Sequence, residues 1–205
     1  GSIGSELCRQ LTLFEPSQLL LLDRDENGLH ATQLSIHGRA LLEDPCLILA
    51  SIRDADRVDE IFANYHPDVV FHAAALKHLP LLEMHPDEGW KTNVRGTQNL
   101  LESAQRHGVD RFVNVSTDKA ANPTSVLGWT KRITERLTAH QTTQGDMDCV
   151  SVRFGNVLGS NGSVLRAFEA QVAMGSPITV THPDITRYFM TISEAARLTI
   201  YAGAI

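Results

Sequence analysis

Ionisable side chains of opposite charge lie close together in residues 115–131, VSTDKAANPTSVLGWTK. Asp118 and Lys119 are neighbours, Thr117 precedes them, and Lys131 ends the stretch. A carboxyl group and an amine can exchange protons with a ligand, and a second amine can bind a hydroxyl group. Neighbours on an extended chain point to opposite faces, but on a turn both side chains can face one ligand. A solvated surface pair is the alternative interpretation.

Residues 115–131 resemble the active-site stretch of a nucleotide-dependent oxidoreductase, except at the position four residues before Lys131. Nucleotide-dependent oxidoreductases usually have a tyrosine there, whereas this chain has Leu127. An aliphatic side chain cannot accept a proton, so the oxidation of an alcohol at this site would need another base. Thr117, Asp118 or a water held by them are the candidates.

The opening GSIG has half of a glycine fingerprint. Gly1 and Gly4 have the spacing of the last two glycines in G-x-x-G-x-x-G. Glycine lets the backbone approach a pyrophosphate, and the following helix supplies N–H donors. Asp23 lies about 20 residues later, after the apolar run LLLL, where a carboxylate can bind ribose hydroxyls and favours NAD over NADP. Arg24 could instead pair with a 2′-phosphate. A turn cap is the alternative interpretation of Asp23.

A second apolar run ends in small residues, in the sequence FHAAALKH. Ala73, Ala74 and Ala75 would let a cofactor lie flat against the end of a strand. Doubly wound sheets bind their ligands at this edge, which favours a functional interpretation. Tight packing between a helix and the sheet is the alternative.

The composition argues against several classes of function. The chain has 205 residues, is 42% hydrophobic and has a net charge of -6 without a long basic run, so nucleic acid is not an expected partner. No apolar run reaches the ~18–20 residues of a membrane span. Three isolated cysteines, Cys8, Cys46 and Cys149, predict buried thiols in a reducing, cytoplasmic location. The histidines between residues 66 and 85 lack metal-ligand spacing, so no metal is predicted.

Alternating strands and helices are expected to position these residues. Runs rich in Leu, Ile and Val predict strands at residues 18–22, 46–51, 68–73, 111–116 and 149–153. Helical periodicity predicts helices at residues 5–13, 55–64, 96–106 and 130–140. This alternation predicts right-handed βαβ units, and therefore an α/β fold with a Rossmann-type doubly wound parallel sheet.

Two regions are expected within this fold. Residues 1–153 are predicted to form an NAD(P)-binding Rossmann domain, truncated at its N-terminus because the first strand and the first glycine of the fingerprint are missing. Residues 154–205 are predicted to form a small substrate-binding lobe that is truncated at its C-terminus. A sheet without its first strand would expose apolar edges, so this piece alone is expected to bind NAD weakly.

Six stretches of the chain together resemble the CapD-like polysaccharide biosynthesis proteins. They are GSIGSEL, FHAAALKHLPLLE, KTNVRGTQNLLESA, VSTDKAANPTSVLGWTKR, RFGNVLGSNGSV and THPDITRYFMTISEA. Members of this family are extended short-chain dehydrogenases/reductases that act as UDP-N-acetylglucosamine 4,6-dehydratases. The resemblance extends over essentially the whole chain, and STDKAANPT is far more specific than the glycine motif.

The resemblance implies roles for individual residues. Thr117 would be the catalytic Ser/Thr, Asp118 and Lys119 the acid–base pair, and Lys131 a ligand of the nicotinamide ribose. Leu127 occupies the position where family members have Tyr or Met. The residues expected to bind the cofactor are Gly1, Ser2, Ile3, Gly4, Asp23, Arg24, Ser51, Ile52, Ala73, Ala74, Ala75, Asn93 and Lys131. The residues expected to bind the UDP-sugar are Lys77, Asn156, Ser163, Thr181 and Arg187.

Two of these positions carry further expectations. The guanidinium of Arg187 suits a pyrophosphate because it can bind phosphate oxygens in a bidentate manner. Ser51 stands where many relatives have an aspartate for the adenine amine, so that contact is expected to be weaker.

The reaction implied by the resemblance is 4,6-dehydration of a UDP-N-acetylhexosamine, such as UDP-N-acetylglucosamine, to a 4-keto-6-deoxy sugar for a surface polysaccharide or glycan. The C4 hydroxyl is oxidised, Lys119 removes the C5 hydrogen, Asp118 protonates the departing C6 hydroxyl, and hydride returns to C6. A UDP-sugar 4-epimerase or reductase is the first alternative, although it needs no such acid–base pair. A non-catalytic nucleotide-binding relative is the second.

The cofactor and the partners follow from the same resemblance. NAD is the expected cofactor, with NADP as the alternative. A UDP-sugar and further copies of the chain in a homo-oligomer are the expected partners. Relatives often have membrane spans upstream, so the parent protein is a candidate for membrane anchoring, while this chain is predicted to have no membrane segment.

Overall fold

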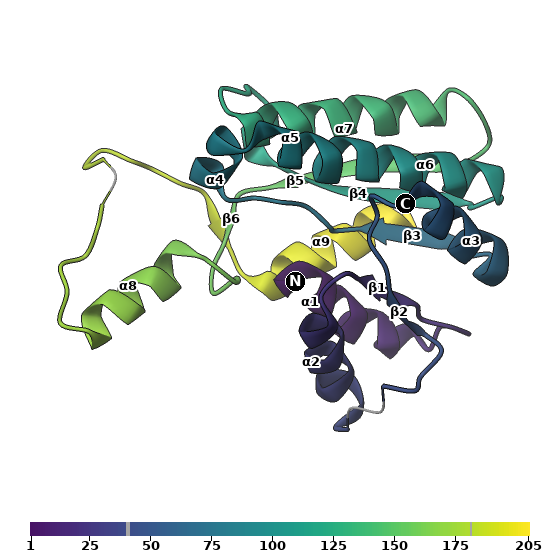
Figure 1. Cartoon of the computed structure of the whole chain (residues 1–205), viewed down its shortest axis with the longest axis horizontal. Helices are drawn as coiled ribbons and strands as arrows, with labels where there is room; N and C mark the ends of the chain where they lie inside the picture. The colour runs from purple at the N-terminus through teal and green to yellow at the C-terminus, as the bar shows by residue number, and fades with distance from the viewer. Residues whose placement is uncertain (40–41, 181) are drawn as a thin grey trace.

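The computed structural model describes residues 1–39, 42–180 and 182–205. Within these residues, parallel strands form the centre of the molecule and helices cover them on both faces (Figure 1). One sheet pairs β1 (Leu21–Asp23) with β2 (Leu47–Leu49). In a second sheet, β4 (Arg111–Thr117) lies between β3 (Val69–His72) and β5 (Asp148–Phe154). The predicted doubly wound parallel α/β architecture is confirmed.

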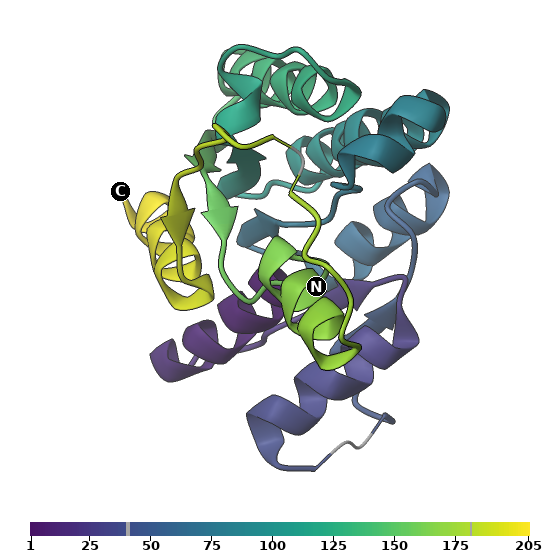
Figure 2. The ribbon, with the colours of Figure 1, turned by 90° about the vertical axis from the view of Figure 1, so that its left-hand side faces the viewer.

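Helices on the two faces of β3–β5 come from different parts of the chain. One face is covered by α6 (Gly96–Arg106) and α7 (Val126–Thr142), with α3 (Ala55–Tyr65) packed beside α6. The other face is covered by α9 (Ile192–Ala204), which packs against α1 (Ser2–Leu11). The helix α2 (Glu26–His37) packs on α1 and β1, as Figures 1 and 2 show from two directions.

Short elements connect and extend this framework. They are η1 (Thr12–Phe14), α4 (Leu79–Met84), α5 (Pro86–Gly89), the π-helix η2 (Trp90–Arg95) and the 3₁₀ turn η3 (Asp118–Ala120). After β5, β6 (Asn156–Val157) pairs with β7 (Phe189–Met190), and α8 (Val164–Ala173) stands away from the sheets (Figure 1). No helix among the described residues combines the length and the apolar character needed to cross a bilayer.

Helix α3 illustrates how local sequence specifies an element. Val58, Ile61 and Phe62 recur at helical spacing, and all three are buried in the core. Asp54 caps the N-terminus because its side chain accepts a hydrogen bond from the Arg57 amide. The helix predicted at residues 55–64 is therefore confirmed at Ala55–Tyr65.

The central strand β4 delivers the predicted acid–base residues to one edge of the sheet. Phe112 and Val113 are fully buried, as expected for a parallel strand covered on both faces. Asn114 is also buried, aligns with His72 of β3 and Ser151 of β5, and donates to the Ser151 hydroxyl at 3.2 Å. The carboxyl end of β4 therefore emerges from a rigid, hydrogen-bonded layer.

Helices α2 and α9 are among those that were not predicted, as are α4, α5, α8 and the π-helix η2. Helix α2 begins at Asp25, whose side chain accepts from the Asn27 amide. Helix α9 begins with a capping box formed by Thr191 and Glu194. This helix belongs to the region predicted as a substrate-binding lobe, yet it packs on β3, β4 and β5. The division of the chain at residue 153 stays a prediction.

Candidate functional site

The predicted acid–base residues meet in the turn after β4, residues 117–119, which we name the acid–base turn. Lys119 Nζ donates hydrogen bonds to Asp118 Oδ1 at 2.9 Å and to Asn156 Oδ1 at 3.0 Å. Thr117 Oγ1 donates to the same Asp118 oxygen at 3.0 Å. The 3₁₀ turn η3 thus lets two neighbours in the sequence converge. The structure brings Lys119 of this pair into contact with Asn156, a predicted sugar-binding residue.

The acid–base turn is partly accessible to solvent. The side chains of Lys119 and Asp118 are 26% and 33% exposed, so a ligand can reach both. Burial acts to raise the pKa of Asp118, but hydrogen bonds from Lys119 and Thr117 outweigh it and hold the pKa below its ordinary value. Asp118 is therefore a carboxylate at neutral pH, directly bonded to the Lys119 amine.

Lys131 is a buried amine that is attached to the same strand. Its Nζ donates to the main-chain oxygen of Val115 at 2.8 Å, two residues before Thr117. Burial lowers the pKa of Lys131 to about 8, although the Glu135 carboxylate acts to raise it. An amine with such a pKa changes its charge near neutral pH, which is common at functional sites.

Leu127 is buried in the first turn of α7, where Ser125 caps the helix by accepting from the Gly128 amide at 3.2 Å. Gly128 allows this turn to approach the site. A Cβ atom there would lie 2.7 Å from the Lys119 main-chain oxygen and 3.1 Å from Pro123 Cα. Leucine in this position is a packing residue without a titratable group, and the glycine sets the distance between helix and acid–base turn.

Asn93 ties three segments together from inside the π-helix η2. Its Nδ2 donates to Leu76 O at 3.0 Å and to Thr130 Oγ1 at 3.1 Å, while its Oδ1 accepts from Leu76 N at 2.8 Å. Single π-helical turns are frequent at functional sites. Asn93 is fully buried, so it fixes the segment after residues 73–75 against α7 rather than offering a group to solvent.

The glycine stretch and Asp23 lie side by side. The Gly1 nitrogen is 3.5 Å from Asp23 Oδ2, and residues 2–4 form the first turn of α1. A Cβ atom added at Gly1 or Gly4 would meet no described atom within 4 Å. This space borders the N-terminal amides of α1, an arrangement that suits an anionic phosphate. These residues fit a dinucleotide.

A cavity of about 220 Å³ follows the carboxyl ends of β1, β2 and β3. It is lined by Arg24, Arg53, Leu76, Lys77, His78, Leu81, Leu82, His85 and Glu88. Burial lowers the pKa of Lys77. Arg53 was not predicted, although it follows the predicted Ser51 and Ile52, and its Nη2 donates to Glu88 Oε2 at 2.5 Å. The excess of cationic side chains makes this cavity suitable for phosphorylated ligands.

The predicted residues Ser51 and Ile52 lie just before Arg53, and hydrogen bonds fix both of them. Ser51 Oγ accepts from Arg53 N at 3.3 Å, and the Ile52 oxygen accepts from Asn99 Nδ2 at 2.9 Å. A Cβ atom at Gly96 would lie 2.6 Å from Ile52 Cδ1, so α6 packs tightly against Ile52. The segment after β2 is therefore fixed in place.

The predicted sugar-binding residues lie in different parts of the structure. Ser163 precedes α8, and its buried Oγ has no hydrogen-bond partner among the described residues. Arg187 is exposed and donates to the Thr186 main-chain oxygen at 2.7 Å. Thr181 lies outside the described residues. The structure brings Asn156 to the acid–base turn and leaves Arg187 in an exposed segment.

Comparison with known proteins places this chain in a family. A family described as polysaccharide biosynthesis protein matches residues 1–205. The chain belongs to this family. It is 46% identical over 209 residues to the probable polysaccharide biosynthesis protein EpsC of Bacillus subtilis, and 44% identical over 209 residues to the capsular polysaccharide biosynthesis protein CapD of Staphylococcus aureus. The alignments cover 100% of this chain but 34% and 35% of these relatives, so the chain spans about a third of their length.

Solved structures share the fold of this polysaccharide biosynthesis protein. Pen from Bacillus thuringiensis matches with a TM-score of 0.91 and 34% identity, covering 100% of this chain and 63% of that chain. DesIV, a dTDP-glucose 4,6-dehydratase of Streptomyces venezuelae solved as a double mutant with NAD and DAU bound, matches at 0.85 and 22% identity, covering 99% and 69%. UDP-glucose 4-epimerase of Thermotoga maritima with UDP-glucose matches at 0.84 and 22%, covering 98% and 69%. At 22% identity these last two similarities show the fold alone.

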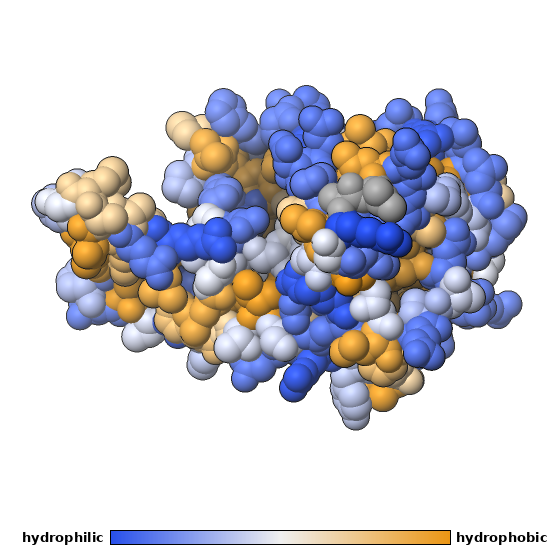
Figure 3. Space-filling model, turned by 90° about the horizontal axis from the view of Figure 1, so that it is seen from below, coloured by the Kyte–Doolittle hydropathy of each residue, from blue (hydrophilic) through white to orange (hydrophobic). Residues whose placement is uncertain are grey.

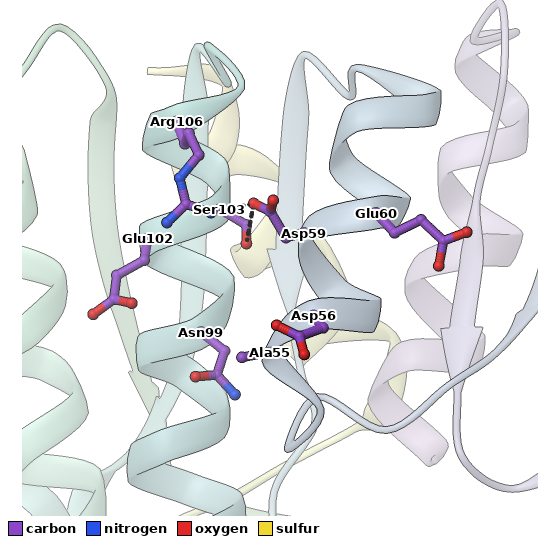
Figure 4. Close-up of a pocket in the computed structure, with 8 residues that line it drawn as sticks. All are labelled: Ala55, Asp56, Asp59, Glu60, Asn99, Glu102, Ser103 and Arg106. Carbon is purple, nitrogen blue, oxygen red and sulfur yellow. Dashed lines mark hydrogen bonds and ion pairs between the residues drawn. The ribbon is translucent and has the colours of Figure 1, made fainter.

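A larger cavity, of about 390 Å³, lies away from the strand ends, between α3 and α6 (Figure 4). It is lined by Ala55, Asp56, Asp59, Glu60, Asn99, Glu102, Ser103 and Arg106. Hydrogen bonds from His107 and Arg106 hold the pKa of Asp59 below its ordinary value. The four carboxylates would repel phosphate groups, and the cavity contains none of the predicted site residues. Size alone therefore does not identify the functional site here.

Proposed function

We propose that this protein removes water from a UDP-N-acetylhexosamine, with UDP-N-acetylglucosamine as the expected substrate and NAD as the cofactor. The product would be a 4-keto-6-deoxy sugar for polysaccharide biosynthesis. The observation that carries the proposal is the 2.9 Å hydrogen bond between Lys119 Nζ and Asp118 Oδ1 at the carboxyl end of β4. Membership of the polysaccharide biosynthesis family and the likeness to DesIV support it.

The acid–base pair has the composition that elimination of water needs. Transfer of the shared proton from Lys119 to Asp118 leaves a neutral amine and a carboxylic acid. Lys119 then takes the proton from C5, and Asp118 donates its proton to the hydroxyl that leaves C6. In the elimination one proton is accepted and one is donated, so the pair regains its starting charges at that step. When hydride returns to C6, Lys119 gives a proton to C5, and the proton taken from the C4 hydroxyl replaces it on the amine. Thr117 and Asn156 hold the two groups in place.

The proposed cofactor site is formed by residues around the glycine stretch. Bound NAD would supply the transient oxidation at C4 that makes the C5 hydrogen acidic. Gly1 and Gly4 border space for a pyrophosphate, Asp23 lies beside them for ribose hydroxyls, and Lys131 is proposed to bind the nicotinamide ribose. Because Leu127 cannot move a proton, Thr117, Asp118 or a water bound to them would accept the proton of the C4 hydroxyl.

A UDP-sugar 4-epimerase is the second candidate, since one of the similar solved structures has this activity in its name. Epimerisation changes C4 alone, so it would leave the acid–base pair without a task. The buried, aliphatic Leu127 also removes the phenol on which such enzymes normally depend. Both observations favour the dehydratase.

The test incubates the full-length protein with UDP-N-acetylglucosamine and NAD and follows the sugar by mass spectrometry and NADH by absorbance. The dehydratase is expected to give a product lighter by one water without net NADH. A product of unchanged mass at a new retention time would support the epimerase. Unchanged sugar would contradict both enzymes and support a nucleotide-binding protein.

A further inference from the structure

Glu135 of α7 is a carboxylate with only 8% exposure. Its Oε1 accepts hydrogen bonds from Ser116 Oγ at 2.5 Å and from Arg153 Nε at 2.7 Å. Its Oε2 accepts from Arg153 Nη2 at 2.6 Å and from Arg132 Nη1 at 3.3 Å. Arg153 binds both carboxylate oxygens through its guanidinium fork, which a lysine cannot reproduce.

The partners of Glu135 come from the two strands that carry the acid–base turn and Asn156. Ser116 of β4 and Arg153 of β5 are opposite each other in the parallel register, so one carboxylate from α7 bridges both strands. Ser116 immediately precedes the acid–base turn, and Arg153 lies three residues before Asn156. Lys131 lies one helical turn before Glu135 on α7.

We propose that Glu135 is a positioning residue for this site. Through Ser116 and Arg153 it holds the ends of β4 and β5 together, so that the acid–base turn stays in contact with Asn156. Its negative charge also keeps the buried Lys131 amine protonated. This inference rests on the proposed dehydratase function of the same site.

Charged or titratable groups face Glu135 or Lys131 from three elements. Glu135 and Arg132 lie on α7, Arg153 lies on β5, and His72 lies on β3, where burial lowers its pKa to about 3 and keeps it neutral. Burial acts to raise the pKa of Glu135, but hydrogen bonding led by Arg153 holds it below its ordinary value. Glu135 is therefore an anion among cations. Without it, nothing in this group opposes the burial that lowers the pKa of Lys131.

The test replaces Glu135 by Gln in the full-length protein and measures the rate of water loss from neutral to alkaline pH. We expect turnover at neutral pH to fall roughly tenfold to a hundredfold with little change in KM, because the reacting groups are displaced while the sugar contacts remain. The alkaline limb of the pH profile is expected to move down by about one pH unit. Glu60→Gln is the matched control, since Glu60 also pairs with an arginine, Arg57, but is exposed on α3.

A second measurement distinguishes a failure of this inference from a failure of the proposed function. NMR titration of ¹⁵N-labelled lysine side chains reports the pKa of Lys131 without any turnover, and we expect it to be lower in Glu135→Gln than in the wild type. An unchanged Lys131 pKa together with an unchanged pH profile would overturn the inference. If Glu135→Gln does not fold, Arg153→Lys is the second variant. It keeps the positive charge at position 153 but cannot bind both oxygens of Glu135 as the guanidinium does. Reduced turnover in that variant supports the inference, and wild-type turnover overturns it.

Discussion

The acid–base region and the segment of residues 158–190 are built in different ways. Around β4 and α7, polar groups are buried and bonded to one another, as Asn93, Lys131 and Glu135 illustrate. In the segment 158–190, helix α8 buries no side chain and Tyr188 is 83% exposed. Apolar side chains also gather on the surface of this segment, at the left of Figure 3.

This difference separates two parts of the function. The groups proposed to transfer protons are held in fixed positions by hydrogen bonds within the chain, which is the condition for efficient acid–base catalysis. Groups predicted to select the sugar, such as Arg187, lie in the exposed segment. The proposed proton transfer therefore depends on groups fixed by the core, whereas the proposed selection of the sugar depends on an exposed segment.

The largest effect is expected from removing the Lys119 amine of the acid–base turn. Lys119→Met removes the group proposed to take the C5 proton and should lower the rate of water loss by about 10³-fold. NAD affinity, measured by equilibrium titration, should stay at the wild-type value because the glycine stretch is untouched. Lys91→Met is the control, since Lys91 is an exposed lysine paired with Glu88. Wild-type turnover in Lys119→Met would refute the assigned role.

The next effect concerns Lys131 and depends on pH. Its pKa is lowered from 10.5 to about 8, so between these values the unfolded chain binds more protons at this site than the folded chain. Stability from this residue therefore rises as pH increases from 8 to 10.5, and the full cost is present below pH 8. The difference corresponds to roughly 3 kcal/mol.

Lys131→Met should accordingly raise the free energy of unfolding at pH 7 by up to about 3 kcal/mol while abolishing turnover. The gain should shrink in urea titrations carried out at strongly alkaline pH. Lys91→Met should change the stability by less than about 0.5 kcal/mol at either pH. A stability gain that is independent of pH would contradict the assigned cause.

A smaller effect is expected where α7 approaches the acid–base turn. Gly128→Ala places a methyl group 2.7 Å from the Lys119 main-chain oxygen, so either the helix or the turn has to move. We expect a loss of about 1–3 kcal/mol in urea unfolding and a lower turnover. Gly4→Ala is the control for stability, because the added methyl meets no described atom. Equal stabilities of the two variants would show that the close approach is unimportant.

The smallest effect is expected in helix α8 of the exposed segment. Val172→Ala in α8 should change the free energy of unfolding by less than about 0.5 kcal/mol, because Val172 is 63% exposed. Val58→Ala, the same substitution at a position with 0% exposure, should cost about 2 kcal/mol through lost burial and a cavity. Similar costs for the two variants, measured by thermal or urea unfolding, would mean that α8 is packed in solution.

Helices that bury a clear apolar face were predicted from the sequence, whereas two helices that bury polar or small residues, α2 and α9, were not. The helix predicted at residues 96–106 is found at Gly96–Arg106 because Leu100, Leu101 and Ala104 recur on its buried face. Helix α2 buries Leu29, Thr32 and Gln33, so two of its three buried residues are polar and its periodicity is hidden. Helix α9 buries small residues, among them Ala195 and Ala196, which give an equally weak signal.

The same limit applies to the site. Thr117, Asp118 and Lys119 could be found because they are neighbours at the end of a predicted strand, and their contacts are local. Glu135 could not be found, since its contacts with Ser116 and Arg153 depend on the register between β4 and β5. A hydrophobic pattern predicts that strands pair, but it does not determine which polar side chains become opposite one another.

The anchor of Lys131 has a consequence for how this site tolerates mutation. Its partner at 2.8 Å is a main-chain oxygen, which every amino acid at position 115 possesses. Substitutions of Val115 can change the volume beside the strand, but they cannot delete the acceptor. A saturation screen for lost activity should therefore be intolerant at codon 131 and permissive at codon 115 toward residues of similar size. A single substitution of Lys131 removes the donor of this hydrogen bond, whereas no substitution of Val115 removes the acceptor.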